Sequence, residues 1–95
     1  MSTATLYSQP GCAPCFVMEK ALAKYGIAVT KRDVREDDAA YAELVEFYET
    51  LTDGRHPATP VVVIDDADGA GSREILLGPA LDDLKAMIRD GKVVA

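Results

Sequence analysis

The chain has two cysteines, Cys12 and Cys15, and only two residues separate them. They follow a short strand-like run and a Gln9-Pro10-Gly11 turn, and they open a segment with helical periodicity. In the first turn of a helix the backbone N–H groups lack intrahelical partners, and the helix dipole favours negative charge. Both effects lower the pKa of the leading cysteine, so Cys12 is expected to be a thiolate nucleophile near neutral pH.

Cys15 lies three positions further along, close enough to attack a mixed disulfide formed at Cys12. The pair therefore predicts thiol–disulfide exchange. A structural zinc site fits less well, because two cysteines and the single histidine, His56, cannot supply four ligands from one chain. A purely structural disulfide also fits less well, because so small a loop hardly restricts the unfolded chain.

The composition favours a single soluble domain spanning residues 1–95. Hydrophobic residues make up 48% and charged residues 27% of the chain, as in ordinary globular proteins. No stretch approaches the ~20 apolar residues of a membrane span, and the first residues do not resemble a signal peptide. The net charge of −6 argues against a nucleic-acid partner. We therefore expect a cytoplasmic protein, in a compartment where free thiols persist, that binds neither membrane nor nucleic acid.

The hydrophobic pattern predicts elements in the order β-α-β-α-β-β-α, with a parallel pair first and an antiparallel hairpin later. Strands are expected over residues 4–8, 27–34, 61–64 and 73–77, with a hairpin loop over 65–72. Helices are expected from residue 13 or 14 to 25, from a cap at 37 or 38 to about 51, and from 81 to 91. Each helix is followed by a glycine suited to its end: Gly26, Gly54 and Gly91.

Helical spacing also predicts which faces are buried. The first helix should bury Val17, Met18, Ala21, Leu22 and Tyr25. The second should bury Tyr41, Leu44, Val45, Tyr48 and Leu51, with Glu43, Glu46 and Glu49 facing solvent. The four consecutive β-branched residues 61–64 indicate a strand that is buried on both faces.

Together these features resemble the glutaredoxins of the thioredoxin-like superfamily over nearly the whole chain. The matching residues are Leu6-Tyr7-Ser8, Cys12-Ala13-Pro14-Cys15, Thr59-Pro60 before a valine-rich strand, and Gly78 ahead of Asp82 and Asp83. The resemblance implies an α/β thioredoxin-like fold, with a four-stranded mixed sheet flanked by three helices. It also implies a dithiol–disulfide oxidoreductase without a tightly bound cofactor or a metal.

The resemblance further assigns residues around the cysteines. Pro60 would be a cis proline that leaves the Thr59 backbone free to pair with an extended substrate or thiol. Cis peptide bonds are essentially confined to proline, although an ordinary proline at a strand start fits the residues alone equally well. Gly78 and Asp82 would contact the substrate or thiol, and Arg55 could offer a carboxylate contact. The residues expected to support the cysteines are Gln9, Pro10, Gly11, Ala13 and Pro14.

The chain departs from the glutathione-using members at several positions. Many of these carry a basic residue ahead of a Cys-Pro-Tyr-Cys motif, whereas here Gln9-Pro10-Gly11 precedes the cysteines and Ala13-Pro14 lies between them. The paired glycines of the family are reduced to Gly78-Pro79. These departures are closer to the glutaredoxin-like electron donors of ribonucleotide reductase, which take electrons from thioredoxin reductase.

The electron source therefore stays open between glutathione, another low-molecular-weight thiol and thioredoxin reductase. The expected partner is a disulfide-containing client protein, and the expected state is a monomer. Two alternatives remain: an iron–sulfur-cluster-binding module in which two chains each contribute Cys12, and a thiol redox sensor without turnover. A single cysteine is typical of the cluster carriers, so Pro14 and Cys15 make that alternative weaker.

Overall fold

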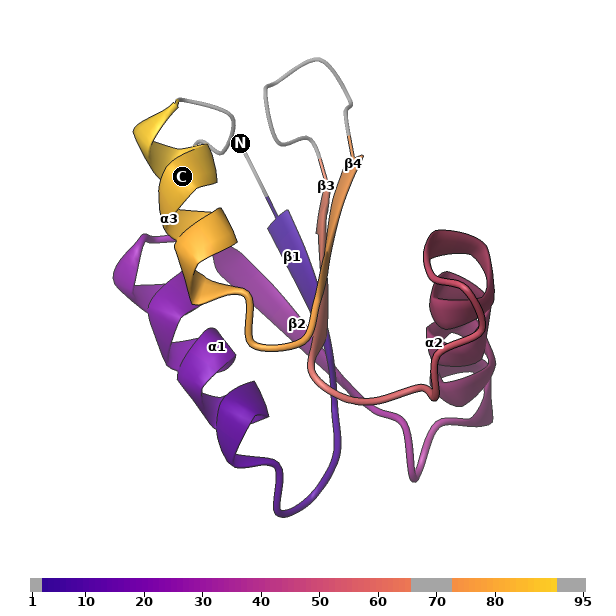
Figure 1. The fold of residues 1–95 in the computed structure, drawn as a ribbon. Coiled ribbons are helices and arrows are strands. Elements are labelled where there is room, and N and C mark those ends of the chain that lie inside the picture. The colour runs from indigo at the N-terminus through magenta and orange to yellow at the C-terminus, as the bar shows by residue number, and fades with distance from the viewer. Residues whose placement is uncertain (1–2, 66–72, 91–95) are drawn as a thin grey trace.

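The computed structural model describes residues 3–65 and 73–90, shown in colour in Figure 1. Four strands form one sheet in the order β2-β1-β3-β4. β2 runs parallel to β1, whereas β3 is antiparallel to both β1 and β4. The elements are β1 (Thr3–Ser8), α1 (Ala13–Lys24), β2 (Ala28–Asp33), α2 (Asp38–Leu51), β3 (Val61–Asp65), β4 (Arg73–Leu77) and α3 (Leu81–Arg89).

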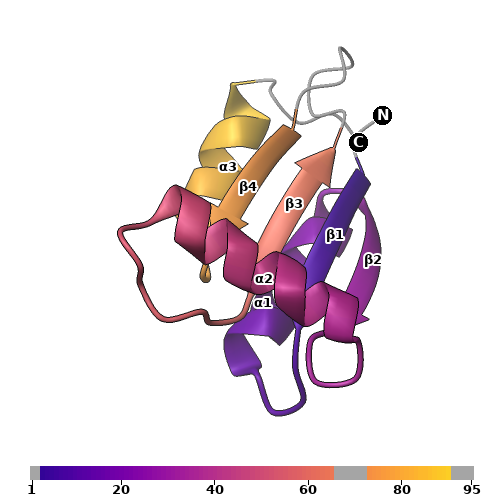
Figure 2. The ribbon, with the colours of Figure 1, turned by 90° about the vertical axis from the view of Figure 1, so that its right-hand side faces the viewer.

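The helices form two layers around the sheet. α1 and α3 cover one face and α2 covers the other, as the two views in Figures 1 and 2 show. The predicted four-stranded mixed sheet with three helices is thereby confirmed. Asp65, predicted to begin the hairpin loop over 65–72, is instead the last residue of β3. The rest of that loop, 66–72, and the predicted helix end at Gly91 lie outside the described residues. Among the helices of the described residues, none is long and apolar enough to cross a membrane.

β3 lies at the centre of the core. All four residues predicted to be buried on both faces, Val61 to Ile64, are at most 3% exposed. On the α1 and α3 side, the strands contribute Leu6, Val62 and Ile64, which pack with Met18, Leu22 and Leu84. On the α2 side, Tyr7, Val61 and Val63 pack with Leu44 and Tyr48. β1, which leads directly to the cysteines, is therefore held from both faces.

The buried face of each long helix is narrower than predicted. α1 packs through Met18 and Leu22, with Ala21 and Tyr25 partly buried against the core, whereas Val17 is 44% exposed. In α2, Leu44 and Tyr48 are buried, whereas Tyr41 and Leu51 are each 52% exposed, contrary to prediction. The buried residues recur every fourth position, so they form one row of side chains that faces the sheet. A residue next to one of them in the sequence points about 100° away from that row.

Two further details of α2 differ from the prediction. Glu43 does not face solvent freely, because it is half-buried and pairs with Arg32. The helix ends at Leu51, as predicted, where the Thr52 N–H donates to the Tyr48 carbonyl, but the predicted stop residue is not at that end. Gly54, with φ of 78°, lies in the turn beyond and is not the residue at the helix end. Gly26, with φ of 75°, does follow α1 directly, as predicted.

The N-terminus of α2 provides a pH-dependent contribution to stability. Asp37 caps the helix by accepting the Ala40 N–H at 3.0 Å, and it pairs with Arg32 at 3.2 Å. The Ala40 amide first, and Arg32 second, hold the pKa of the Asp37 carboxyl below its usual range against the opposing effect of burial. A depressed pKa stabilises the fold above the unfolded pKa of about 3.9, and the stabilisation is lost as the pH falls through the folded pKa.

We therefore expect Asp37→Asn to lower the urea midpoint at neutral pH and to converge with the wild type at about pH 2. Asparagine keeps a capping oxygen, so the comparison isolates the charge. Urea titrations at a series of pH values measure the difference. A gap of equal size at neutral and acid pH would contradict the ionic role of Asp37.

Candidate active site

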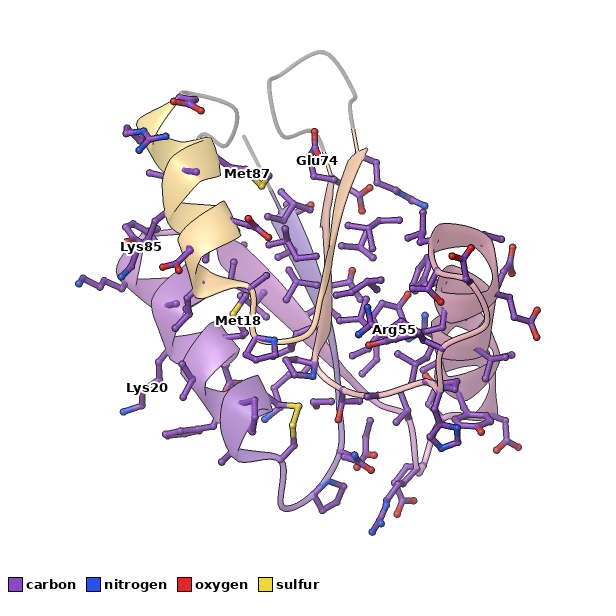
Figure 3. All side chains as sticks on the ribbon, in the orientation of Figure 1. Met18, Lys20, Arg55, Glu74, Lys85 and Met87 are labelled. Carbon is purple, nitrogen blue, oxygen red and sulfur yellow. A yellow bond between two sulfur atoms is a disulfide. The ribbon has the colours of Figure 1, made fainter. Side chains whose placement is uncertain are left out.

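Cys12 and Cys15 lie together at the N-terminus of α1. Cys12 is the N-cap residue, with an extended backbone, and Cys15 is in the first turn. Their sulfurs are joined in a disulfide, with 5.2 Å between the Cα atoms, and Figure 3 shows this bond at the end of the helix. Cys15 is 4% exposed, whereas Cys12 is partly exposed. An external thiol or disulfide can therefore reach Cys12 more easily than Cys15.

The residues around the pair fix this placement. Gly11 adopts φ of 76°, a conformation that favours glycine, and turns the chain from β1 into the helix. The Cys12 N–H donates to the Gln9 carbonyl at 3.3 Å and closes the turn. Pro14 is accommodated because its missing N–H has no partner in the first helical turn. Pro10, Ala13 and Pro14 are exposed, so the disulfide lies at the surface of the described structure.

Two hydrogen bonds reach the Cys12 sulfur, and a third supports one of the two donors. The Cys15 backbone N–H donates to it at 3.1 Å. The Thr59 hydroxyl donates to it at 3.5 Å, and the Gln9 side-chain amide donates to the Thr59 oxygen at 3.0 Å. A hydroxyl has one proton, so the bond from Gln9 to its oxygen leaves that proton for the sulfur. When the disulfide is reduced, the same donors face a sulfur that can carry negative charge, where hydrogen bonds are stronger.

The Thr59-Pro60 peptide bond is cis, in agreement with the expectation from the family resemblance. Pro60 is fully buried, and its carbonyl accepts the N–H of Gly78 at 2.8 Å. Outside the helices and strands of the described residues, no backbone–backbone hydrogen bond involves Thr59. The fold thus brings Thr59 to the Cys12 sulfur and joins Gly78 to Pro60, the residue that follows Thr59.

The other predicted binding residues are less closely tied to the disulfide. Asp82 is exposed in the first turn of α3. Arg55 and His56 are exposed in the segment between α2 and β3, and Figure 3 shows Arg55 near α2, away from the disulfide. Among the described residues, none of these three side chains forms a hydrogen bond with Cys12 or Cys15.

A hollow of about 500 Å³ lies beside the disulfide, and the sequence did not predict it. Its lining includes Phe16 and Glu19 from α1 and Lys31 from β2. The parallel register places Lys31 beside Leu6 of β1, so a register prediction could have found the contact. Phe16 could not be identified in this way, because helical spacing alone does not reveal that its ring is 57% exposed.

A second polar cluster lies on the opposite face of the sheet, toward α2. Burial, and next the negative charge of Glu43, raise the pKa of Tyr7, and Arg32 opposes that rise. The Arg32 guanidinium lies 5.6 Å from the centre of the Tyr7 ring and pairs with Asp37 and Glu43. This cluster links β1 and β2 to α2. Within residues 3–65 and 73–90, no group of three or more histidine, cysteine or acidic side chains is placed to hold a metal ion.

The Thr59 hydroxyl gives a testable expectation. We expect Thr59→Val, which keeps the side-chain shape, to slow alkylation of reduced Cys12 several-fold at slightly acid pH, because a hydrogen bond to the charged sulfur is lost. Iodoacetamide kinetics as a function of pH measure the effect. Thr50→Val is a matched control, because Thr50 bonds to the Glu46 carbonyl on exposed α2. Equal rates in Thr59→Val and Thr50→Val would contradict the contact.

The chain is similar to a known protein family and to several solved structures. The glutaredoxin family model matches residues 4–67. A mutant of the thioredoxin-like protein BC3987 is 28% identical, with a TM-score of 0.69 over 94% of this chain and 97% of that one. Glutaredoxin from Brucella melitensis is 26% identical, with a TM-score of 0.54 over 95% and 82%. No curated protein matches the chain.

A third structure, oxidised mitochondrial thioredoxin 3 from Saccharomyces cerevisiae, is 19% identical. Its TM-score is 0.57, and the match covers 94% of this chain and 77% of that chain. At that identity the likeness shows the fold alone.

Proposed function

Because the chain belongs to the glutaredoxin family and is a thiol–disulfide oxidoreductase, we propose that it reduces protein disulfides with Cys12 as the attacking thiolate and Cys15 as the resolving thiol. One observation carries this assignment of roles: Cys12 is partly exposed at the helix N-cap, whereas Cys15 is 4% exposed behind it. The hydrogen bonds from Thr59 and from the Cys15 N–H to the Cys12 sulfur support the same assignment.

The cycle has two exchange steps. The Cys12 thiolate attacks one sulfur of the client disulfide, the client S–S bond breaks, and the second client sulfur leaves as a thiolate. Cys15 then gives up its proton to solvent and attacks the Cys12 sulfur. The first client sulfur leaves as a thiolate and the Cys12–Cys15 disulfide forms. Two electrons have passed from the pair to the client.

Neighbouring residues would hold the client during these steps. We propose that the backbone of Thr59 pairs with an extended client segment, supported by the absence of backbone–backbone bonds at Thr59 within the described loops. Pro60 fixes that backbone, and Gly78 is bonded to Pro60 beside it. Asp82, exposed at the start of α3, would contact the ammonium group of a thiol ligand.

The client is a disulfide-containing protein such as ribonucleotide reductase or another thiol-dependent enzyme. Electrons return to the oxidised pair from thioredoxin reductase, from glutathione or from another low-molecular-weight thiol. Gln9, in place of a basic residue, and Gly78-Pro79, in place of paired glycines, support a donor other than glutathione. The cytoplasm is the proposed site of action, because its reductants regenerate the dithiol.

NADPH consumption with a model disulfide tests the proposal in two couplings: thioredoxin reductase alone, and glutathione with glutathione reductase. Cys12→Ser provides the blank. Turnover with thioredoxin reductase only would identify a thioredoxin-like donor, and turnover with glutathione only would identify an ordinary glutaredoxin. If neither coupling supports turnover, the reductant is another low-molecular-weight thiol, provided that the chemically reduced protein still reduces the model disulfide. A chemically reduced protein that fails to do so would contradict the proposed exchange and favour a redox sensor, or a cluster-binding module if the anaerobically purified protein is brown.

A further inference from the structure

Two features border the disulfide. Thr59 contacts the Cys12 sulfur, and a hollow of about 500 Å³, whose lining includes neither Thr59 nor Pro60, also adjoins both cysteines. We call it the β2-side hollow, because it extends from the cysteine turn to the edge strand β2. Its size is within the range of about 300–1,000 Å³ typical of ligand pockets. The residues that matter for its chemistry are Leu6, Cys12, Cys15, Phe16, Glu19 and Lys31.

The interior of the hollow is mostly apolar. Leu6 is 1% exposed within the core, and the Phe16 ring is 57% exposed to solvent. A large aromatic ring left this open next to a reactive disulfide offers a surface that an apolar side chain would cover favourably. Because both cysteines also line the hollow, such a side chain would lie directly beside the sulfur under attack.

The edge of the hollow carries exposed cations. The Lys31 side chain is 58% exposed and pairs with Glu19 at 3.2 Å. The Lys20 ammonium lies 4.9 Å from the centre of the Phe16 ring, and Figure 3 shows Lys20 projecting outward from α1. Four of the 16 acidic residues, Asp38, Glu43, Glu46 and Glu49, are on α2, which covers the opposite face of the sheet in Figure 2, whereas Asp82 and Asp83 are on α3, on the same face as α1. Lys31 is paired with Glu19, so Lys20, beside the Phe16 ring, contributes the net positive charge that can attract an acidic residue here, although the chain has a net charge of −6.

We propose that the β2-side hollow is a client-recognition site that takes the apolar side chain next to the client cysteine, with Lys20 and Lys31 pairing with acidic residues of the same client segment. The client class is thus a protein disulfide in an apolar and acidic sequence. This proposal rests on the proposed function, because it names the substrate of the same cysteine pair.

Peptide mixed disulfides test the proposal. Four short peptides each carry one cysteine joined to 5-thio-2-nitrobenzoate, with leucine or serine next to the cysteine and aspartate or lysine beyond it. The reduced protein attacks the peptide sulfur and releases the coloured thiolate, which is followed by stopped flow. We expect the leucine-aspartate peptide to react about tenfold faster than the serine-lysine peptide. The leucine side chain of the first peptide covers Phe16 and its aspartate pairs with the lysines, whereas the second peptide makes neither contact. Equal rates for all four peptides would overturn the proposal.

Matched variants test which residues cause the preference for leucine and the preference for aspartate. Phe16→Ser should remove most of the leucine preference, whereas Val17→Ser should retain it, because Val17 is exposed on the same helix but does not line the hollow. Lys31→Glu should remove the aspartate preference, whereas Lys85→Glu, the same charge change on exposed α3, should retain it. Equal losses in the two members of either pair would overturn the proposal.

A small uncharged disulfide distinguishes an effect on client binding at this hollow from an effect on the exchange reaction itself. The controls Val17→Ser and Lys85→Glu should reduce bis(2-hydroxyethyl) disulfide at the wild-type rate, measured by the loss of protein thiols after acid quenching. For Phe16→Ser and Lys31→Glu, each peptide rate is divided by the rate with this disulfide, so that a change in thiolate reactivity is not counted as a change in preference. If Lys31→Glu slowed oxidised glutathione as strongly as the acidic peptides, the hollow would take a small charged thiol and the peptide assignment would be wrong. If the wild type reduced none of these disulfides, both the exchange function and this site would be overturned.

Discussion

Cys12→Ser is expected to reduce the rate of disulfide reduction at least about a thousandfold, to the level of the uncatalysed background. The thiolate is the nucleophile in exchange, and a serine hydroxyl has no comparable ionised form near neutral pH. Cys15 alone cannot replace Cys12, because it is 4% exposed. The coupled NADPH assay with a model disulfide measures the loss.

The substitution should leave the fold intact, which makes the loss interpretable. Cys12 is the N-cap of α1, and serine is among the preferred residues at that position. Circular dichroism and the thermal midpoint of the dithiol protein, compared with those of Cys12→Ser, provide the control. A Cys12→Ser protein that folds and still reduces disulfides at the wild-type rate would show that the assignment of the nucleophile is wrong.

Cys15→Ser is expected to stop the cycle after the first exchange and to accumulate a covalent adduct with the client. Cys15 is placed to resolve the mixed disulfide, since its Cα atom lies 5.2 Å from that of Cys12. Without its thiol, the client stays bound to Cys12 through a disulfide. Intact-protein mass spectrometry should then show nearly complete conversion to protein plus one client molecule, and dithiothreitol should release the client.

Two controls define this result. The wild type should give no lasting adduct, because Cys15 resolves it within the cycle. The double variant Cys12→Ser with Cys15→Ser should give none either, because no nucleophile remains. A monothiol route with glutathione can persist in Cys15→Ser, so the adduct is measured without glutathione. An adduct that forms in Cys12→Ser but not in Cys15→Ser would reverse the two assigned roles.

Local signals explain why much of the fold was predictable from sequence. Gly26 marks the end of α1, and Asp37 begins α2 as an N-cap. The four β-branched residues 61–64 indicated a strand buried on both faces, which the structure confirms. The pair Cys12 and Cys15 pointed to exchange chemistry because spacing and helix position are both local properties.

The remaining features depend on contacts between distant residues. The hydrogen bond from Gln9 to Thr59 joins positions 50 residues apart, and the bond from Thr59 to the Cys12 sulfur spans 47. No periodicity reports such contacts. The exposure of Phe16 and Tyr41 likewise depends on how each helix is rotated about its axis against the sheet. The helical period of the sequence does not determine that rotation closely enough to predict it. The surroundings of the cysteine pair are therefore set by tertiary contacts, whereas the cysteine motif itself is local.

Single-turnover stoichiometry tests the central claim most directly. The reduced protein is mixed anaerobically with excess peptide disulfide, quenched with acid, and its free thiols and peptide map are measured against time. We predict that one client disulfide is reduced for each protein, as two protein thiols disappear and the Cys12–Cys15 disulfide forms. Client reduction without oxidation of this pair, or loss of its thiols without client reduction, would contradict exchange through Cys12 and Cys15.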